Sequence, residues 1–235
     1  MSLSENIARV QQNIAAAAIA AGRAPSEVTL VAATKVQTSD TIRAAIAAGI
    51  SVCGENRVQE LTAHLEDNAY EGAELHFIGH LQTNKVKYIV GKVALIHSVS
   101  SDRLMDAIDA QAAKVGVVQD ILLEVNVGHE ESKSGYLPEE VMDAVRKASS
   151  LSNVRLRGLM AIPPVADEPG QNRPYFEQMR QLFIDTKELL GDNVSVIDSL
   201  SMGMSDDYED AIAAGATLVR VGTAMFGARP PRAAE

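Results

Sequence analysis

Cysteine is almost absent from this sequence, whose 235 residues include only Cys53. A lone cysteine excludes a disulfide framework and suits a reducing compartment. Because Cys53 lies within a predicted strand, we expect it to be a small buried hydrophobic residue. Positive charge is also scarce, with 21 Lys and Arg against 31 Asp and Glu and a formal net charge of −10. No basic cluster offsets that charge, so we expect no nucleic-acid partner.

Long apolar runs are missing as well. The longest are short and rich in alanine, far below the roughly 20 residues that a membrane span needs, so we expect no membrane partner. The first six residues hold neither a basic nor an apolar segment, which predicts no secretory signal and a cytoplasmic location. The length fits one α/β barrel, typically about 250 residues. We expect residues 1–235 to form a single domain with a flexible tail from about residue 228.

Short β-branched apolar runs alternate with longer amphipathic segments, which is typical of βα units on a parallel sheet. The predicted strands are residues 28–33, 51–54, 75–79, 94–99, 120–127, 155–160, 195–201 and 217–221. The predicted helices are residues 4–21, 39–48, 57–65, 101–114, 138–149, 175–190 and 208–214. Ser39 and Asp40 are expected to cap the second of these helices. Eight strands buried on both faces predict a closed (β/α)₈ barrel with an extra N-terminal helix, and a doubly wound open sheet is the alternative.

A lysine stands at the tip of the first predicted strand, in the string Ala-Ala-Thr-Lys that ends at Lys35. Active sites of such barrels lie at the carboxyl ends of the strands, so Lys35 is expected at the barrel mouth. An amine in a desolvated mouth loses part of its preference for charge and can condense with an aldehyde. From position alone, a solvated loop lysine remains an equal alternative.

The loops after the seventh and eighth predicted strands face that lysine and are rich in small and hydroxyl residues. Barrels frequently hold a phosphate between these two loops. Gly203 and Gly222 would let the backbone approach an anion, and Ser205 and Thr223 would donate hydroxyl hydrogen bonds. Ordinary βα turns favour the same residues, so either loop alone is a weak signal. The two loops together, opposite Lys35, predict a phosphate site.

Other polar residues have open interpretations. Arg220 shares a strand face with Gly222, and its acceptor is either a ligand or an acidic side chain in a buried ion pair. Lys133 follows the fifth strand, where a solvated loop lysine is favoured over a second amine at the mouth. His76 and His80 favour hydrogen bonding over metal binding, because no third ligand is evident.

Several longer strings occur in order along nearly the whole chain. They are Ala-Ala-Thr-Lys (32–35), Gly-Glu-Asn (54–56), Val-Gln-Glu (58–60), His-Phe-Ile-Gly-His-Leu-Gln-Thr-Asn-Lys (76–85), Ser-Lys-Ser-Gly (132–135), Arg-Gly-Leu-Met-Ala-Ile (157–162), Leu-Ser-Met-Gly-Met-Ser-Asp-Asp (200–207) and Val-Arg-Val-Gly-Thr-Ala-Met-Phe-Gly (219–227). Together they resemble the pyridoxal 5′-phosphate (PLP) homeostasis protein family, which is similar in fold to the barrel domain of alanine racemase.

The resemblance implies that PLP is the cofactor and that Lys35 holds it as a Schiff base. The expected cofactor-binding residues are Lys35, Asn56, Met160, Ser201, Gly203, Ser205, Arg220, Gly222 and Thr223. By the resemblance, Ser205, Gly222 and Thr223 hold the phosphate. The segment 36–38 lacks the second lysine and the proline of some relatives, which argues against a secondary PLP-transfer role at residue 37.

The resemblance also implies that Arg220 faces the pyridine nitrogen, while Asn56 and Met160 line the pocket. It implies a non-catalytic carrier or regulator of intracellular PLP, with PLP-dependent apo-enzymes as partners. Arg220 would disfavour protonation of the pyridine ring and so weaken it as an electron sink. The chain also ends eight residues after Gly227, without the second, β-rich domain of the related enzymes. A weak amino-acid racemase and a PLP-free Schiff-base aldolase are the alternatives.

Overall fold

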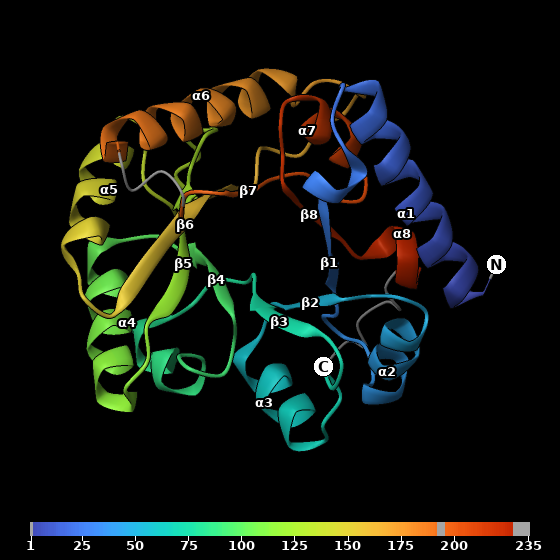
Figure 1. Cartoon of the computed structure of the whole chain (residues 1–235), viewed down its shortest axis with the longest axis horizontal. Coiled ribbons are helices and arrows are strands. Elements are labelled where there is room, and N and C mark those ends of the chain that lie inside the picture. The colour runs from blue at the N-terminus through green and yellow to red at the C-terminus, as the bar shows by residue number, and fades with distance from the viewer. Residues whose placement is uncertain (1, 192–195, 228–235) are drawn as a thin grey trace.

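The computed structural model describes residues 2–191 and 196–227, and within them eight parallel strands close into a barrel (Figure 1). The strands are β1 (Thr29–Ala33), β2 (Val52–Glu55), β3 (Glu74–Phe77), β4 (Leu95–Val99), β5 (Gln119–Val125), β6 (Val154–Ala161), β7 (Ser199–Ser201) and β8 (Leu218–Val221). They follow one another around the ring, and β8 pairs with β1, with Thr29 opposite Leu218. This closure confirms the (β/α)₈ barrel and excludes the open sheet, which would leave two edge strands unpaired.

Helices surround the barrel, and α1 is the expected extra helix at the N-terminus. The α-helices are α1 (Leu3–Ala20), α2 (Ser39–Ala47), α3 (Val58–Glu66), α4 (Asp102–Val115), α5 (Val141–Ser150), α6 (Arg173–Leu190), α7 (Tyr208–Ala213) and α8 (Thr223–Phe226). Ile7, Val10 and Ile14 form the buried face of α1, which lies against α7 and α8 (Figure 1). A capping box between Ser2 and Glu5 begins this helix and satisfies two of its unpaired backbone amides.

The cap of α2 differs from the prediction. Thr38, rather than Ser39 or Asp40, is the N-cap, and its hydroxyl accepts a hydrogen bond from the Thr41 amide at 3.2 Å. Ser39 is already inside the helix, where its hydroxyl is bonded to His64 Nδ1 at 3.0 Å. Neighbouring hydroxyl residues compete for a cap, and here a tertiary contact occupies the second of them.

Two other elements differ in extent. The strand predicted over residues 195–201 is shorter, because β7 spans only Ser199–Ser201; residue 195 lies outside the described residues, as does the tail from residue 228. The helix predicted over residues 138–149 begins with a 3₁₀ turn, Pro138–Glu140, before α5. A 3₁₀ helix, Thr83–Tyr88, connects β3 to β4. The remaining boundaries agree to within two residues. In the described part of the chain, no helix combines the length and the apolar character needed to cross a membrane.

Side chains alternate in direction along each strand, so one set packs beneath the helices and the other fills the barrel. The interior set is largely apolar and consists of Val31, Ala33, Val52, Ile78, Leu95, Leu122, Met160 and Leu218. Several buried polar side chains, among them His76, His97, Ser201 and Arg220, share strand faces with this set. Polar groups in such an interior need hydrogen-bond partners. Here they bond to one another, and these hydrogen bonds extend from one end of the barrel to the other.

Candidate functional site

Lys35 lies two residues beyond the end of β1, at the carboxyl end of the barrel and half-buried. A tight turn holds it, in which the Gln37 amide donates to the Thr34 carbonyl at 3.1 Å. Val36 within this turn has a φ of +60°, and its amide donates to Glu60 Oε2 of α3 at 2.8 Å. A β-branched residue in the left-handed region costs on the order of 1–3 kcal/mol. The strained turn directly after Lys35 makes this strand end a candidate functional position.

The loop after β7 and the start of α8 meet at Ser205. Its hydroxyl accepts hydrogen bonds from the amides of Gly222 and Ala224, at 3.3 and 3.4 Å. Both bonds are long, so the two amides are available to a stronger acceptor. A Cβ on Gly222 would lie 3.3 Å from Ala33 in β1, which leaves little room for a side chain. Thr223 begins α8 and is exposed beside these amides. The structure thus brings together the three residues expected at the phosphate.

Gly203 has a structural reason to be glycine that differs from the expected one. Its φ is +91°, and a Cβ would lie 2.6 Å from the Ala211 Cβ and 2.9 Å from the Tyr208 Cα. Glycine therefore lets the loop after β7 pack against α7. Its carbonyl accepts a hydrogen bond from the Arg220 amide at 3.0 Å, which joins this loop to β8. Gly203 therefore holds the loop in place.

Arg220 extends into the barrel from β8 and is almost completely buried. Its Nη1 donates to Ser201 Oγ at 2.5 Å, and its Nη2 donates to the Ala161 carbonyl at 2.9 Å. Burial lowers the pKa of its guanidinium to about 10, partly offset by the charges of Glu124 and Asp207. Arg220 therefore remains cationic at neutral pH. Within the described residues, none of the ion pairs of the structure includes Arg220, so the expected alternative of a buried ion pair is not found.

A cavity of about 630 Å³ opens at this end of the barrel, between the ends of β2, β3, β5 and β6. Asn56, Glu124 and Lys133 are among the residues that line it. Asn56 Oδ1 and Glu124 Oε2 are buried atoms without a hydrogen-bond partner among the described residues. Burial raises the pKa of the Glu124 carboxyl to about 7, against the opposing effect of Arg220. Met160 lies inside the barrel and is fully buried.

Lys133 lies at the mouth, but backbone groups hold it there. Its Nζ forms an ion pair with Glu130 and donates to the carbonyls of Ile162 and Pro163, at 3.5 and 3.1 Å. The favoured interpretation, a solvated loop lysine, is therefore wrong: the amine is partly buried and bonded. Cys53 is fully buried in β2, as predicted, and burial raises the pKa of its thiol to about 12.

The two motif histidines take part in hydrogen bonds, as predicted. His80 Nδ1 is bonded to Ser134 Oγ at 3.2 Å, and His76 is bonded to Glu74 and His97. The described part of the chain contains no group of three or more His, Cys, Asp or Glu side chains that could hold a metal ion.

Glu124 and His97 were not found from the sequence. Glu124 is the last residue but one of β5 and follows its apolar run, and a charged residue in a strand that is buried on both sides was itself a usable signal. His97 lies within β4 and is completely buried. Its importance depends on strands that are distant in the sequence, and no local pattern indicates it.

The chain matches the family model "Alanine racemase, N-terminal domain" over residues 5–230. It is 44% identical over 229 residues to a protein of Aquifex aeolicus (strain VF5) named pyridoxal phosphate homeostasis protein, covering 97% of this chain and 99% of that protein. This chain belongs to the pyridoxal phosphate homeostasis protein family. The fold of this family member is similar to that of PipY from Synechococcus elongatus PCC7942, whose structure was solved with PLP bound, with a TM-score of 0.82, 31% identity and coverage of 96% of this chain and 100% of PipY.

Alanine racemase from Streptomyces coelicolor A3(2) is similar to this homeostasis-family chain in fold only. The TM-score is 0.69 and the identity 21%, with 95% of this chain and 59% of the racemase covered. The matched part is the barrel, in agreement with the family model.

Proposed function

We propose that this chain binds PLP at the carboxyl end of its barrel, through a Schiff base with Lys35, and acts as a non-catalytic carrier or regulator of PLP. The amine of Lys35 would displace the aldehyde oxygen of PLP as water, so that the bond is reversible. The observation that carries the proposal is the meeting of a strained lysine turn after β1 with two amides that converge on Ser205 after β7 and β8.

The donor set of the site fits the cofactor's phosphate. Ser205 and Thr223 can each donate a hydroxyl hydrogen bond, and the amides of Gly222 and Ala224 can turn from Ser205 to an anion. A phosphate oxygen is a stronger acceptor than a hydroxyl, so this exchange is favourable. The chain as a whole is acidic, with a net charge of −10. An anion would therefore be held here by these local hydrogen-bond donors and not by the overall charge of the protein.

The polar groups near the ring also fit. Arg220 is a buried cation with two of its five donors committed, to Ser201 and Ala161. It suits an unprotonated pyridine nitrogen, which is an acceptor. Asn56 Oδ1 is a buried acceptor without a donor among the described residues, and the ring hydroxyl of PLP would supply one. Ser201 is already shared between Arg220 and His97, so we assign it to the support of Arg220 rather than to contact with the cofactor.

The electrostatics of Arg220 support the carrier role. Bound PLP supplies an electron sink for chemistry at an amino-acid α-carbon, and that sink is strongest when the pyridine nitrogen is protonated. A guanidinium with a pKa of about 10 stays charged at neutral pH and opposes that protonation. The single, buried cysteine suits a reducing compartment, and a cytoplasmic location with apo-enzymes as recipients of PLP forms part of the proposal.

One observation favours an enzymatic alternative. Glu124 has a carboxyl pKa of about 7 and an unpartnered oxygen at the mouth cavity, as a general base at neutral pH requires. A weak racemase is therefore the second candidate. The visible spectrum of purified protein incubated with PLP tests binding directly: a yellow protein that survives desalting supports it, and a colourless one contradicts it. Turnover of enantiomerically pure alanine at high protein concentration then separates the carrier from the racemase.

A further inference from the structure

A row of five polar side chains runs through the interior of the barrel, from the mouth to the opposite end. Arg220 Nη1 contacts Ser201 Oγ at 2.5 Å, and Ser201 Oγ contacts His97 Nδ1 at 2.9 Å. His97 Nε2 contacts His76 Nδ1 at 2.9 Å, and His76 Nε2 contacts Glu74 Oε1 at 2.7 Å. The residues come from β8, β7, β4 and β3, and we call this row the interior chain.

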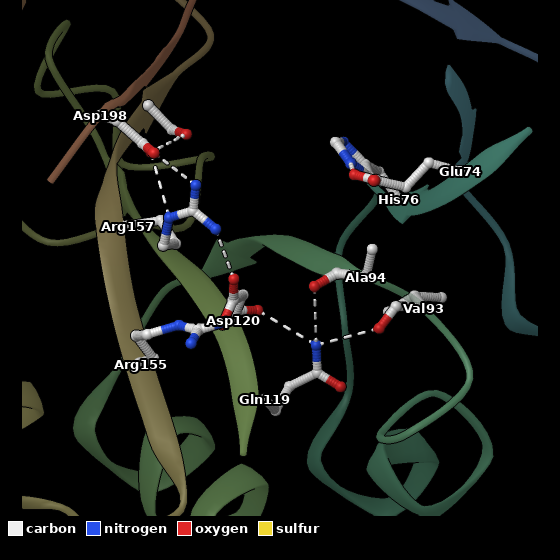
Figure 2. A network of polar contacts seen from close by, with 10 residues as sticks. Glu74, His76, Val93, Ala94, Gln119, Asp120, Arg155, Arg157 and Asp198 are labelled. Atoms are coloured by element: carbon white, nitrogen blue, oxygen red, sulfur yellow. Dashed lines mark hydrogen bonds and ion pairs between the residues drawn. The ribbon is translucent and has the colours of Figure 1, made fainter. Parts of the chain in front are cut away.

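The far end of the interior chain reaches solvent. Glu74 is 57% exposed in its side chain and lines a cavity of about 750 Å³ at the amino ends of the strands. Figure 2 shows Glu74 and His76 at this end, with Arg157 and Asp120 in a neighbouring network. The hydrogen bond from His76 lowers the pKa of the Glu74 carboxyl, and the charge of Arg157 adds to the effect. Glu74 is therefore a carboxylate at neutral pH.

The chemistry of the two ends restricts where the protons in between can lie. Arg220 can only donate and ionised Glu74 can only accept. A neutral His76 that donates to Glu74 carries its proton on Nε2, which leaves its Nδ1 as an acceptor for His97. Burial lowers the pKa of His97 well below its usual value, and the positive charges of a protonated His76 and of Arg220 act in the same direction, so the His97 ring is neutral. His97 therefore donates from Nε2 and accepts from Ser201 at Nδ1, and all four hydrogen bonds point from Arg220 to Glu74.

We propose that the interior chain is a positioning device that holds the Arg220 guanidinium against the cofactor ring and is anchored by Glu74 at the opposite end of the barrel. The proposal rests on the proposed function for the identity of the ring. Nη1 of Arg220 is fixed on β7 through Ser201 and Nη2 on β6 through the Ala161 carbonyl, so the plane of the guanidinium cannot turn. Ser201, His97, His76 and Glu74 are positioning residues, because each acts on the ring only through Arg220.

The surroundings argue against a purely structural role. The interior positions of such a barrel are otherwise filled by residues such as Leu95, Leu122 and Leu218. A buried polar row is no more stabilising than apolar packing of the same volume. The other charged groups that act on Arg220 are Glu124 from β5 and Asp207 from the loop before α7, and neither is hydrogen-bonded to it in the structure. The interior chain thus fixes the orientation of the Arg220 guanidinium, whereas the nearby charges only attract it.

The first test measures the protons themselves. Nitrogen-15 NMR of the histidine rings in the cofactor-free protein at pH 7 is expected to show both His76 and His97 protonated on Nε2 and unprotonated on Nδ1. An Nδ1–H tautomer or a doubly protonated ring at either residue overturns the direction of the chain. This measurement does not depend on PLP binding.

The second test asks whether a substitution at the far end of the barrel changes the binding of PLP at the mouth. Glu74→Ala removes the last acceptor at an exposed position, and a loss of about 2- to 10-fold in PLP affinity is expected, the range of one hydrogen bond. Ser201→Ala removes the direct support of Arg220 and is expected to lose more. The pyridine nitrogen signal of ¹⁵N-labelled PLP should shift in both variants. Glu27→Ala is the matched control, since Glu27 lines the same cavity and is 53% exposed but lies outside the interior chain.

The outcomes separate the proposals. Unchanged affinity and nitrogen signal in both Glu74→Ala and Ser201→Ala, with folding intact by circular dichroism, overturn the positioning role. Equal effects of Glu74→Ala and Glu27→Ala overturn it too, because they indicate a general loss of charge. Should the wild type bind no PLP, the proposed function fails together with the ring contact, while the histidine tautomers still decide whether the interior chain exists.

Discussion

The Gly222 amide donates a hydrogen bond to Ser205 Oγ at 3.3 Å, which joins the loop after β7 to the end of β8. The same oxygen accepts from the Ala224 amide at 3.4 Å, so one hydroxyl occupies two backbone donors. In the proposed complex, an incoming phosphate would compete with this hydroxyl for the amides. Ser205 would then be both a donor to the phosphate and the group that the phosphate displaces.

The two hydroxyl residues at this site should contribute unequally to PLP binding. Thr223→Val removes one charge-assisted donor, and we expect a loss of about 1.5–3 kcal/mol in binding free energy. Ser205→Ala also releases the amides of Gly222 and Ala224 for the phosphate, so its loss should lie near the lower end of that range. Equilibrium titration with PLP measures both. Pyridoxal without phosphate should bind all three proteins equally, and a large effect of either variant on pyridoxal would assign the loops another role.

Lys35→Ala should abolish the yellow colour and any cofactor fixed by borohydride, since the other lysine at the mouth, Lys133, is held by Glu130 and by the carbonyls of Ile162 and Pro163. The fold should be retained, because Lys35 lies in a turn after the strand. Peptide mapping of the reduced protein checks the position of the adduct. Lys85→Ala is the control and should keep both colour and adduct. An adduct on Lys133 or Lys85 in the wild type would contradict the assignment.

The barrel and much of its mouth were predictable because they depend on local patterns. Alternating apolar runs determine the strands, and the strand-end rule places Lys35 and the two loops at one end. The interior chain was not predictable, because His97 and Ser201 are 104 residues apart and meet only across the barrel. The cap of α2 was missed for a related reason: the contact between Ser39 and His64 leaves Thr38 to cap the helix.

The buried carboxyl of Glu124 should make stability depend on pH. Burial raises its pKa from 4.5 to about 7 in the folded protein, so between these values the folded state binds more protons than the unfolded state. The free energy of unfolding then falls as the pH rises through this range, by at most about 3 kcal/mol. Glu124→Gln should abolish this fall, as measured by urea unfolding at several pH values between 5 and 8. Glu71→Gln, at an exposed site, is the control, and a constant difference between wild type and Glu124→Gln would contradict the prediction.

The charge of Arg220 should slow the exchange of the α-proton of a bound amino acid. Wild-type protein loaded with PLP should bind alanine but exchange its α-proton very slowly, because the guanidinium keeps the pyridine nitrogen unprotonated. Arg220→Glu supplies an acceptor that favours protonation, and we expect exchange to rise about tenfold or more, equivalent to about 1.4 kcal/mol in the barrier. Arg220→Gln removes the charge without adding a carboxylate and should give a smaller rise. Deuterium exchange at the α-carbon, followed by NMR in heavy water, measures all three.

The same exchange experiment distinguishes two reasons for inactivity. Exchange at enzyme-like rates in the wild type would end the carrier interpretation and favour the racemase, with Glu124 as its base. If the wild type and both Arg220 variants are equally inert while PLP remains bound, the charge of Arg220 is not the cause of the inactivity. The site then lacks a positioned base. Glu124→Gln in the Arg220→Glu background tests whether Glu124 is the base. Should that second change remove the gained exchange, Glu124 accepts the proton, and the carrier differs from an enzyme by the charge of one buried side chain.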